Sequence, residues 1–123
     1  QPLDAGAMND AARFLEGVCD FAAFAGPATP SDAATMRRMH SAAVERDGVH
    51  VTMSFKANAF LHQQVRRMAG TLVSVGNGKL TLEGFRQLLR DAVRGAAKSL
   101  MPEHGLCLVR IEYPESGPGA LPA

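Results

Sequence analysis

Residues 56–76 read KANAFLHQQVRRMAGTLVSVG, and this stretch decides how the rest of the chain is arranged. Four apolar side chains recur in it at steps of four, three and four residues, which places them on one face of a helix. They are Leu61, Val65, Met68 and Leu72. Asn58 is a candidate N-cap, because its side-chain oxygen can accept hydrogen bonds from the free amides of a first turn. Gly76, followed by Asn77-Gly78, is a typical helix end. The sequence therefore predicts one central helix with a single buried face.

The residues at the start of the chain predict a second helix and a loop. Apolar side chains recur at helical spacing over residues 8–18, behind a linker-like start at residues 1–7. Phe21 and Phe24 predict a short helical turn docked on the core. Residues 25–35 are rich in glycine, proline and small side chains, which is typical of a loop.

A β-hairpin is predicted between this loop and the central helix. Strands over residues 36–46 and 49–56 flank Asp47-Gly48, a strong tight-turn signal. In the second strand apolar and polar residues alternate, so one face belongs to the core. The predicted core residues of this strand are Val49, Val51, Met53 and Phe55.

The C-terminal part predicts a further helix and a last strand. Thr81 is a candidate N-cap, and the apolar face of the helix consists of Leu82, Phe85, Leu88, Leu89 and Val93. Residues 106–113 alternate as a strand, and residues 114–123 have the composition of a flexible tail. The order of elements predicts one α+β domain over residues 1–113, with helices packed on one face of a small antiparallel sheet.

Composition is ordinary for one globular domain. The chain has 123 residues, of which 46% are hydrophobic and 20% are charged. No apolar run approaches the length that spans a membrane, and no signal-peptide pattern is present. Cys19 and Cys107 form no disulfide framework, and neither has a cysteine or histidine at zinc-ligand spacing. These features predict a cytoplasmic protein without a metal site.

The net charge of +1 hides an uneven distribution. Residues 1–36 carry one basic and five acidic side chains, whereas residues 37–123 carry twelve basic and seven acidic ones. A basic region is compatible with a polyanionic ligand, because lysine and arginine neutralise phosphates and release counterions. Many domains of similar charge bind no nucleic acid, so both possibilities stay open.

Two sets of arginines are candidates for such an interaction. Arg66 and Arg67 are adjacent near the start of the central helix. Arg86, Arg90 and Arg94 recur every four residues and would form a basic stripe on the next helix. Solvation explains each set as well, because arginines on helices commonly face water.

The order of residues in the central stretch is more specific than its periodicity. Lys56 to Gly76 closely resembles the signature of TruA-type tRNA pseudouridine synthases. The resemblance continues through Gly78-Lys79-Leu80 and a closing segment at residues 102–113. Upstream, residues 8–12 and 20–24 are similar to the helix that opens the same domain. The resemblance covers about residues 8–114, nearly the whole chain.

This resemblance implies the C-terminal half of the pseudouridine synthase fold. It implies an enzyme that isomerises uridine to pseudouridine in the tRNA anticodon arm without a metal or cofactor. In the family the catalytic aspartate lies in an N-terminal domain, within an Arg-Thr-Asp motif that is absent from this sequence. The chain is therefore expected to need that domain, to be inactive alone, and to belong to a homodimer when complete.

The same resemblance implies roles for individual residues. Arg66 corresponds to the arginine that pairs with the catalytic aspartate, where a guanidinium keeps the carboxylate ionised and oriented. Leu106 corresponds to a residue that packs against the target uracil, although its position also fits an ordinary core residue. Further contacts with the RNA are expected from His62, Gln63, Arg67 and Lys79.

Two alternatives come from other functional classes. A stand-alone, non-catalytic RNA-binding domain would bind RNA with a steep salt dependence and form no pseudouridine. A structural scaffold would have no affinity for RNA even at low salt.

Overall fold

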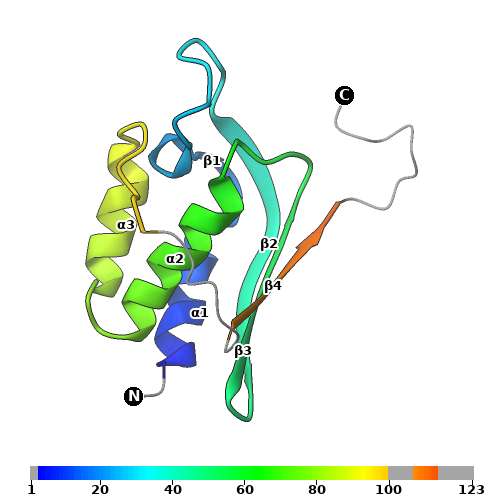
Figure 1. Ribbon diagram of the computed structural model, residues 1–123, viewed down its shortest axis with the longest axis vertical. Coiled ribbons are helices and arrows are strands. Elements are labelled where there is room, and N and C mark those ends of the chain that lie inside the picture. Colours follow the sequence, from blue (N-terminus) through cyan, green and yellow to red (C-terminus); the bar gives the residue numbers. More distant parts are fainter. Residues whose placement is uncertain (1–2, 100–106, 114–123) are drawn as a thin grey trace.

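A computed structural model describes residues 3–99 and 107–113, with the backbone alone for Cys107 and Leu108. The elements in chain order are α1 (Ala5–Arg13), β1 (Gly17–Asp20), the 3-10 helix η1 (Ala22–Phe24), β2 (Met36–Asp47), β3 (His50–Ala57), α2 (Gln64–Gly76), α3 (Leu82–Asp91) and β4 (Cys107–Glu112). The helices lie together on one side of the sheet (Figure 1). The predicted α+β class, with helices covering one face of a small sheet, is confirmed.

The sheet is mixed rather than wholly antiparallel. Its strands lie in the order β1-β2-β3-β4, with antiparallel pairing from β1 to β3 and a parallel pair between β3 and β4. In the parallel pair Val51 lies beside Cys107 and Phe55 beside Ile111. The prediction of an antiparallel sheet was wrong at this strand. The connection from β3 to β4 contains α2 and α3, which lie on one side of the sheet (Figure 1), and a long crossover of this kind is what parallel strands require.

The N-terminal segment forms a helix and an edge strand where the sequence predicted one helix. The carboxylate of Asp4 caps α1 by accepting a hydrogen bond from the Ala7 amide at 3.0 Å. Part of the predicted linker at residues 1–7 is therefore helical. Gly17, with φ of +100°, opens β1, so the helix predicted over residues 8–18 was too long. Helical spacing could not reveal the hydrogen bonds that β2 supplies to β1.

The predicted hairpin is confirmed, with Asp47 at the end of β2 and Gly48 in the turn. Val51, Met53 and Phe55 point into the core as predicted. Val49 lies in the turn and is 68% exposed, so its predicted burial was wrong. Buried and more exposed side chains alternate only from His50 onward, because Val49 lies in the turn and outside the pleated strand.

The buried face of α3 is narrower than predicted. Thr81 caps the helix as predicted, since its hydroxyl accepts a backbone hydrogen bond at 2.9 Å. Phe85 is fully buried, whereas Leu82 and Val93 are exposed. Ala92, in the left-handed conformation with φ of 51°, ends the helix. Val93 follows this turn of the backbone and therefore cannot share the face of Phe85.

The core fills the space between the helices and the sheet. Phe21 and Phe24 are fully buried at η1, which confirms the predicted docked turn. The ring of Phe24 lies 6.2 Å from that of Phe85, measured between centroids. Within the described ranges no helix has the length and apolar character to cross a membrane. Leu106 and the predicted tail at residues 114–123 lie outside the described residues.

Candidate functional site

The turn between β3 and α2 carries several of the predicted site residues. The chain stays paired with β2 as far as Ala57, so Asn58 does not cap α2 and that prediction was wrong. Gln63 precedes the helix instead, in a left-handed conformation with φ of 59°. The fully buried side chain of Gln64 accepts a hydrogen bond from the Leu61 amide at 2.7 Å. This side chain fixes the turn from inside the protein.

Gly26 holds the same turn from the other side. Its amide donates a hydrogen bond to the His62 carbonyl at 2.8 Å. A Cβ atom on Gly26 would lie 2.5 Å from Nδ1 of His62 and 3.0 Å from Cβ of Gln63. Only glycine therefore fits here without displacing the turn. The predicted loop at residues 25–35 contributes a packed wall to the site, which its composition did not indicate.

The two adjacent arginines of α2 have different environments. Arg67 is half-buried, and its guanidinium donates to the Ala97 carbonyl at 3.0 Å and to Oε1 of Gln63 at 3.3 Å. Arg66 is exposed, and among the described residues no hydrogen bond or salt bridge engages its side chain. Arg66 also lies in the first turn of α2, where the helix dipole adds partial positive charge. This end of α2 can bind an anion.

The remaining predicted site residues do not all lie together. His62 is exposed beside Gly26, and across residues 3–99 and 107–113 no cluster of three metal-ligating side chains is found. Lys79 follows the far end of α2, about 15 Å from Arg66 along the axis at ~1.5 Å per residue. The structure thus groups four of the predicted residues at one end of α2: His62, Gln63, Arg66 and Arg67.

Arg67 also lines a cavity that the sequence did not predict. This cavity has a volume of about 440 Å³ and lies between Gly26, α2 and the loop after α3. Its charged lining residues are Arg67, Arg94 and Lys98, and no acidic side chain is among the described residues that line it. The sequence placed Arg94 in a stripe with Arg86 and Arg90. Because α3 ends before Arg94, its guanidinium instead donates to the Ala33 carbonyl at 3.2 Å. No local signal groups Arg67 with Arg94 and Lys98, since α2 and the loop after α3 are separate segments of the sequence.

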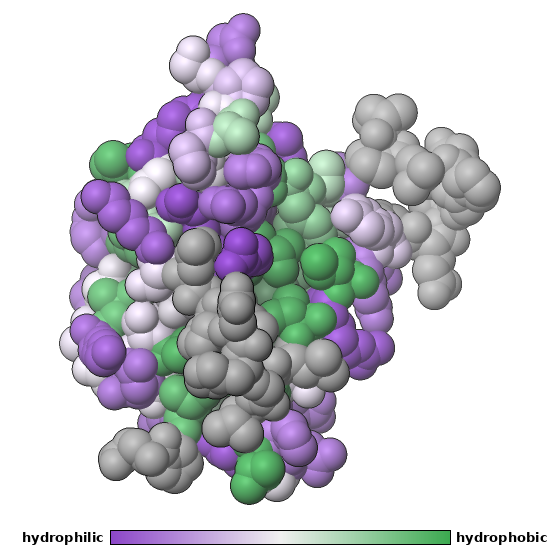
Figure 2. All heavy atoms as spheres, viewed as in Figure 1, coloured by the Kyte–Doolittle hydropathy of each residue, from purple (hydrophilic) through white to green (hydrophobic). Residues whose placement is uncertain are grey.

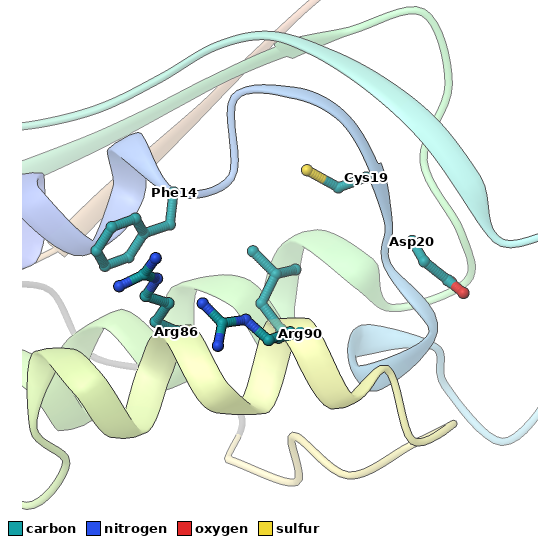
Figure 3. Close-up of a pocket in the computed structure, with 6 residues that line it drawn as sticks. Phe14, Cys19, Asp20, Arg86 and Arg90 are labelled. Carbon is teal, nitrogen blue, oxygen red and sulfur yellow. The ribbon is translucent and has the colours of Figure 1, made fainter.

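The other two arginines of the predicted stripe face a different cavity, shown in Figure 3. Its volume is about 320 Å³, and its lining residues are Phe14, Cys19, Asp20, Arg86, Leu89 and Arg90. Arg86 lies 5.7 Å from the centre of the Phe14 ring and 3.8 Å from a carboxylate oxygen of Glu83. Burial raises the pKa of the Cys19 thiol, which favours the neutral form. This cavity therefore combines both charge signs with apolar walls.

At the edge of the described sheet, β4 and the residue that follows it carry exposed apolar side chains. Ile111 and Tyr113 are each about half exposed, and the Tyr113 ring lies 6.0 Å from that of Phe60. Figure 2 shows apolar residues gathered on this side of the molecule. An edge strand with exposed apolar groups can accept a further element of structure.

Comparison with known proteins identifies a family that this chain matches. Residues 11–114 match a family model described as tRNA pseudouridine synthase. The tRNA pseudouridine synthase A of Shewanella amazonensis is 37% identical over 114 residues, and that of Methylobacterium nodulans is 40% identical over 120 residues. These alignments cover 93% and 95% of this chain but 43% and 47% of the relatives. The enzyme of Chloroflexus aurantiacus is 40% identical over 118 residues, covering 91% of this chain and 41% of its own. The chain spans less than half the length of these relatives.

Proposed function

The chain belongs to the tRNA pseudouridine synthase family, and we propose that it is the C-terminal half of an enzyme that converts uridine to pseudouridine in the tRNA anticodon arm. In this reaction the bond between ribose C1′ and uracil N1 breaks, the base turns, and C1′ joins C5. The proton on C5 is lost and N1 gains one. The atoms balance without an oxidant, a reductant or a cofactor.

The observation that carries this proposal is the environment of Arg66. In our proposal its guanidinium binds the carboxylate of the catalytic aspartate, which an N-terminal domain supplies. An exposed guanidinium at the positive end of a helix lowers the pKa of an approaching carboxylate and orients it. Leu106 is proposed to wall the uracil, and His62 and Gln63 to line the cleft around it.

The proposed partner domain would account for the remaining length of the relatives, of which the chain spans 41% to 47%. Within the described residues β4 is an edge strand, and this edge together with the exposed Ile111 and Tyr113 supports docking of that domain on this side of the sheet. We propose that the complete enzyme is a cytoplasmic homodimer and that this chain is inactive by itself. The homodimer and the inactivity are supported by the resemblance of the sequence to the family, and the cytoplasmic location by the cysteine content and composition.

Arg66→Ala in the complete protein tests the proposal. Removing one partner of a buried ion pair costs about 3–5 kcal/mol, so we expect pseudouridine formation to slow by about two to four orders of magnitude. The rate is measured as tritium release from tRNA that is labelled at C5 of uridine. Arg66→Lys should recover part of the rate, because the charge returns without the bidentate geometry.

Arg90→Ala is the matched control for this experiment. It removes the same charge from a residue that lines the cavity in Figure 3, away from the α2 turn, and should leave the rate within about twofold. An unchanged rate in Arg66→Ala would show that this arginine does not serve the catalytic aspartate.

A stand-alone RNA-binding domain is the second candidate, favoured by the cavity that Arg67, Arg94 and Lys98 line. It predicts that the unaltered complete protein binds tRNA and releases no tritium. The same two measurements therefore separate the two candidates.

A further inference from the structure

The loop after α3 is held on η1 and presents two cations. The amides of Gly95 and Ala97 donate to carbonyls of η1 at 2.9 and 2.8 Å. Gly95 has φ of +75°, a conformation that favours glycine. Arg94 and Lys98 flank these anchored residues and are exposed. These backbone hydrogen bonds thus fix the positions from which the side chains of Arg94 and Lys98 extend.

Lys98 lines two adjoining cavities. One is the cavity that it shares with Arg67 and Arg94, and the other, of about 400 Å³, lies between α2 and α3 and includes Lys79 and Ser74. Among the described lining residues of both cavities there is neither an acidic nor an aromatic side chain. The cations therefore follow the flank of α2 from its first turn to its end.

A neutral donor accompanies the cations in the first cavity. Thr29 lies in its wall, and the hydroxyl oxygen of Thr29 is buried without a hydrogen-bond partner among the described residues. Buried polar groups are normally paired, so an unpaired one beside three cations favours an oxygen-bearing ligand. Phosphate oxygens accept hydrogen bonds from both guanidinium and hydroxyl groups.

We propose that these cations bind successive backbone phosphates of the tRNA strand that carries the target uridine. The track consists of Arg94, Arg67, Lys98 and Lys79. This inference rests on the proposed function, because Arg67 adjoins Arg66 and the track leads away from it. Its length of about 15 Å suffices for several nucleotides, since one strand of a duplex carries a phosphate about every 3.4 Å along the helix axis. Because its described lining residues include no aromatic side chain for base stacking, the track positions the RNA and does not read its sequence.

The experiment compares two double variants of the complete protein. Lys79→Gln with Lys98→Gln removes two charges from the track, and neither ammonium group makes a side-chain hydrogen bond within the described part of the chain. Arg86→Gln with Arg90→Gln removes two charges from the cavity in Figure 3. A charge-retaining pair, Lys79→Arg with Lys98→Arg, controls for changes in shape. The affinity for a tRNA transcript is measured from low to high salt, and circular dichroism confirms that each variant folds.

We expect the Lys79 and Lys98 glutamine pair to make the slope of log affinity against log salt less negative by about 1 to 2, with affinity at 0.1 M salt on the order of tenfold lower. The arginine-substituted pair should behave as the unaltered protein, and the control at Arg86 and Arg90 should change affinity by less than about twofold. In the isomerase assay the glutamine pair should raise KM and leave kcat unchanged, because the track contributes uniform binding.

Two results would overturn the track. One is that the glutamine pair at Lys79 and Lys98 keeps the original salt slope. The other is that the control at Arg86 and Arg90 loses as much affinity for tRNA as the glutamine pair, which would show only an effect of net charge. Failure of the proposed function has a different signature, because then the unaltered protein would bind tRNA and form no pseudouridine. A reduced salt slope in the glutamine pair would in that case still show that Lys79 and Lys98 contact RNA phosphates.

Discussion

Gly26→Ala is the perturbation that most directly tests how the site is built. The new methyl group would lie 2.5 Å from Nδ1 and 3.0 Å from a Cβ atom in the turn that begins at His62. Ordinary contacts of a Cβ atom begin at 3.4 Å, so Nδ1 of His62 must move by about 0.9 Å, Oε1 of Gln63 by about 0.5 Å and Cβ of Gln63 by about 0.4 Å. The exposed imidazole can rotate away, but the Cβ of Gln63 can move only with its backbone.

The expected loss of stability follows from this geometry. Inserting one methyl group into a packed contact costs about 1–3 kcal/mol, and the rotation of His62 into solvent puts Gly26→Ala at the lower end, about 1–2 kcal/mol. Unfolding entropy near 2.1 cal/mol/K per residue makes about 0.26 kcal/mol/K for a domain of this size. The melting temperature should therefore fall by about 4–8 °C.

The effect of Gly26→Ala on activity is expected to be larger than its effect on stability suggests. The turn that moves leads directly into Arg66, and a displacement of about 1 Å at a reacting group can cost about a hundredfold in rate. A shift of about 0.4 Å should then reduce pseudouridine formation by several-fold to tenfold. The measurements are thermal unfolding and tritium release with the complete protein.

Gly6→Ala is the matched control for this substitution. The Cβ that it adds in α1 would have its nearest neighbour at 3.5 Å, so it should be neutral or stabilise the helix by up to about 1 kcal/mol. If Gly26→Ala were as stable and as active as the unaltered protein, the close approach of Gly26 to His62 could not be what positions the turn. Equal destabilisation by Gly6→Ala would also refute the reasoning.

Two further predictions concern the interior of the domain. Gln64→Leu should lower the free energy of unfolding by about 1–3 kcal/mol, because the Leu61 amide loses its buried acceptor. Urea denaturation measures this loss. An unchanged midpoint would show that the hydrogen bond to the Gln64 side chain does not stabilise the fold. Burial raises the pKa of the Cys19 thiol, so less thiolate is present at pH 8 in the folded protein than in the unfolded protein. Iodoacetamide should therefore alkylate this thiol more slowly in the folded protein than in urea. Peptide mapping of Cys19 follows the reaction, and equal rates would refute the effect of burial.

The sequence by itself determined much of the local structure and the family. The alternation of Val51, Met53 and Phe55 and the Asp47-Gly48 turn predicted the hairpin, because both signals come from neighbouring residues. Thr81 predicted the start of α3 for the same reason, since a cap contacts the amides that follow it. The order of residues from Lys56 onward indicated the family that residues 11–114 match.

Tertiary structure alone decided the arrangement of the site, because the interactions that build it join residues far apart in the chain. The start of α2 depends on pairing of Ala57 with β2 and on the contact between Gly26 and His62, and neither leaves a periodic signal. Periodicity grouped Arg94 with Arg86, whereas the left-handed turn after α3 moves Arg94 beside Arg67 and Lys98. Likewise, the direction of β4 follows from the crossover through α2 and α3, which its own alternating residues cannot encode. Local patterns thus fixed the elements, and long-range contacts fixed which side chains meet.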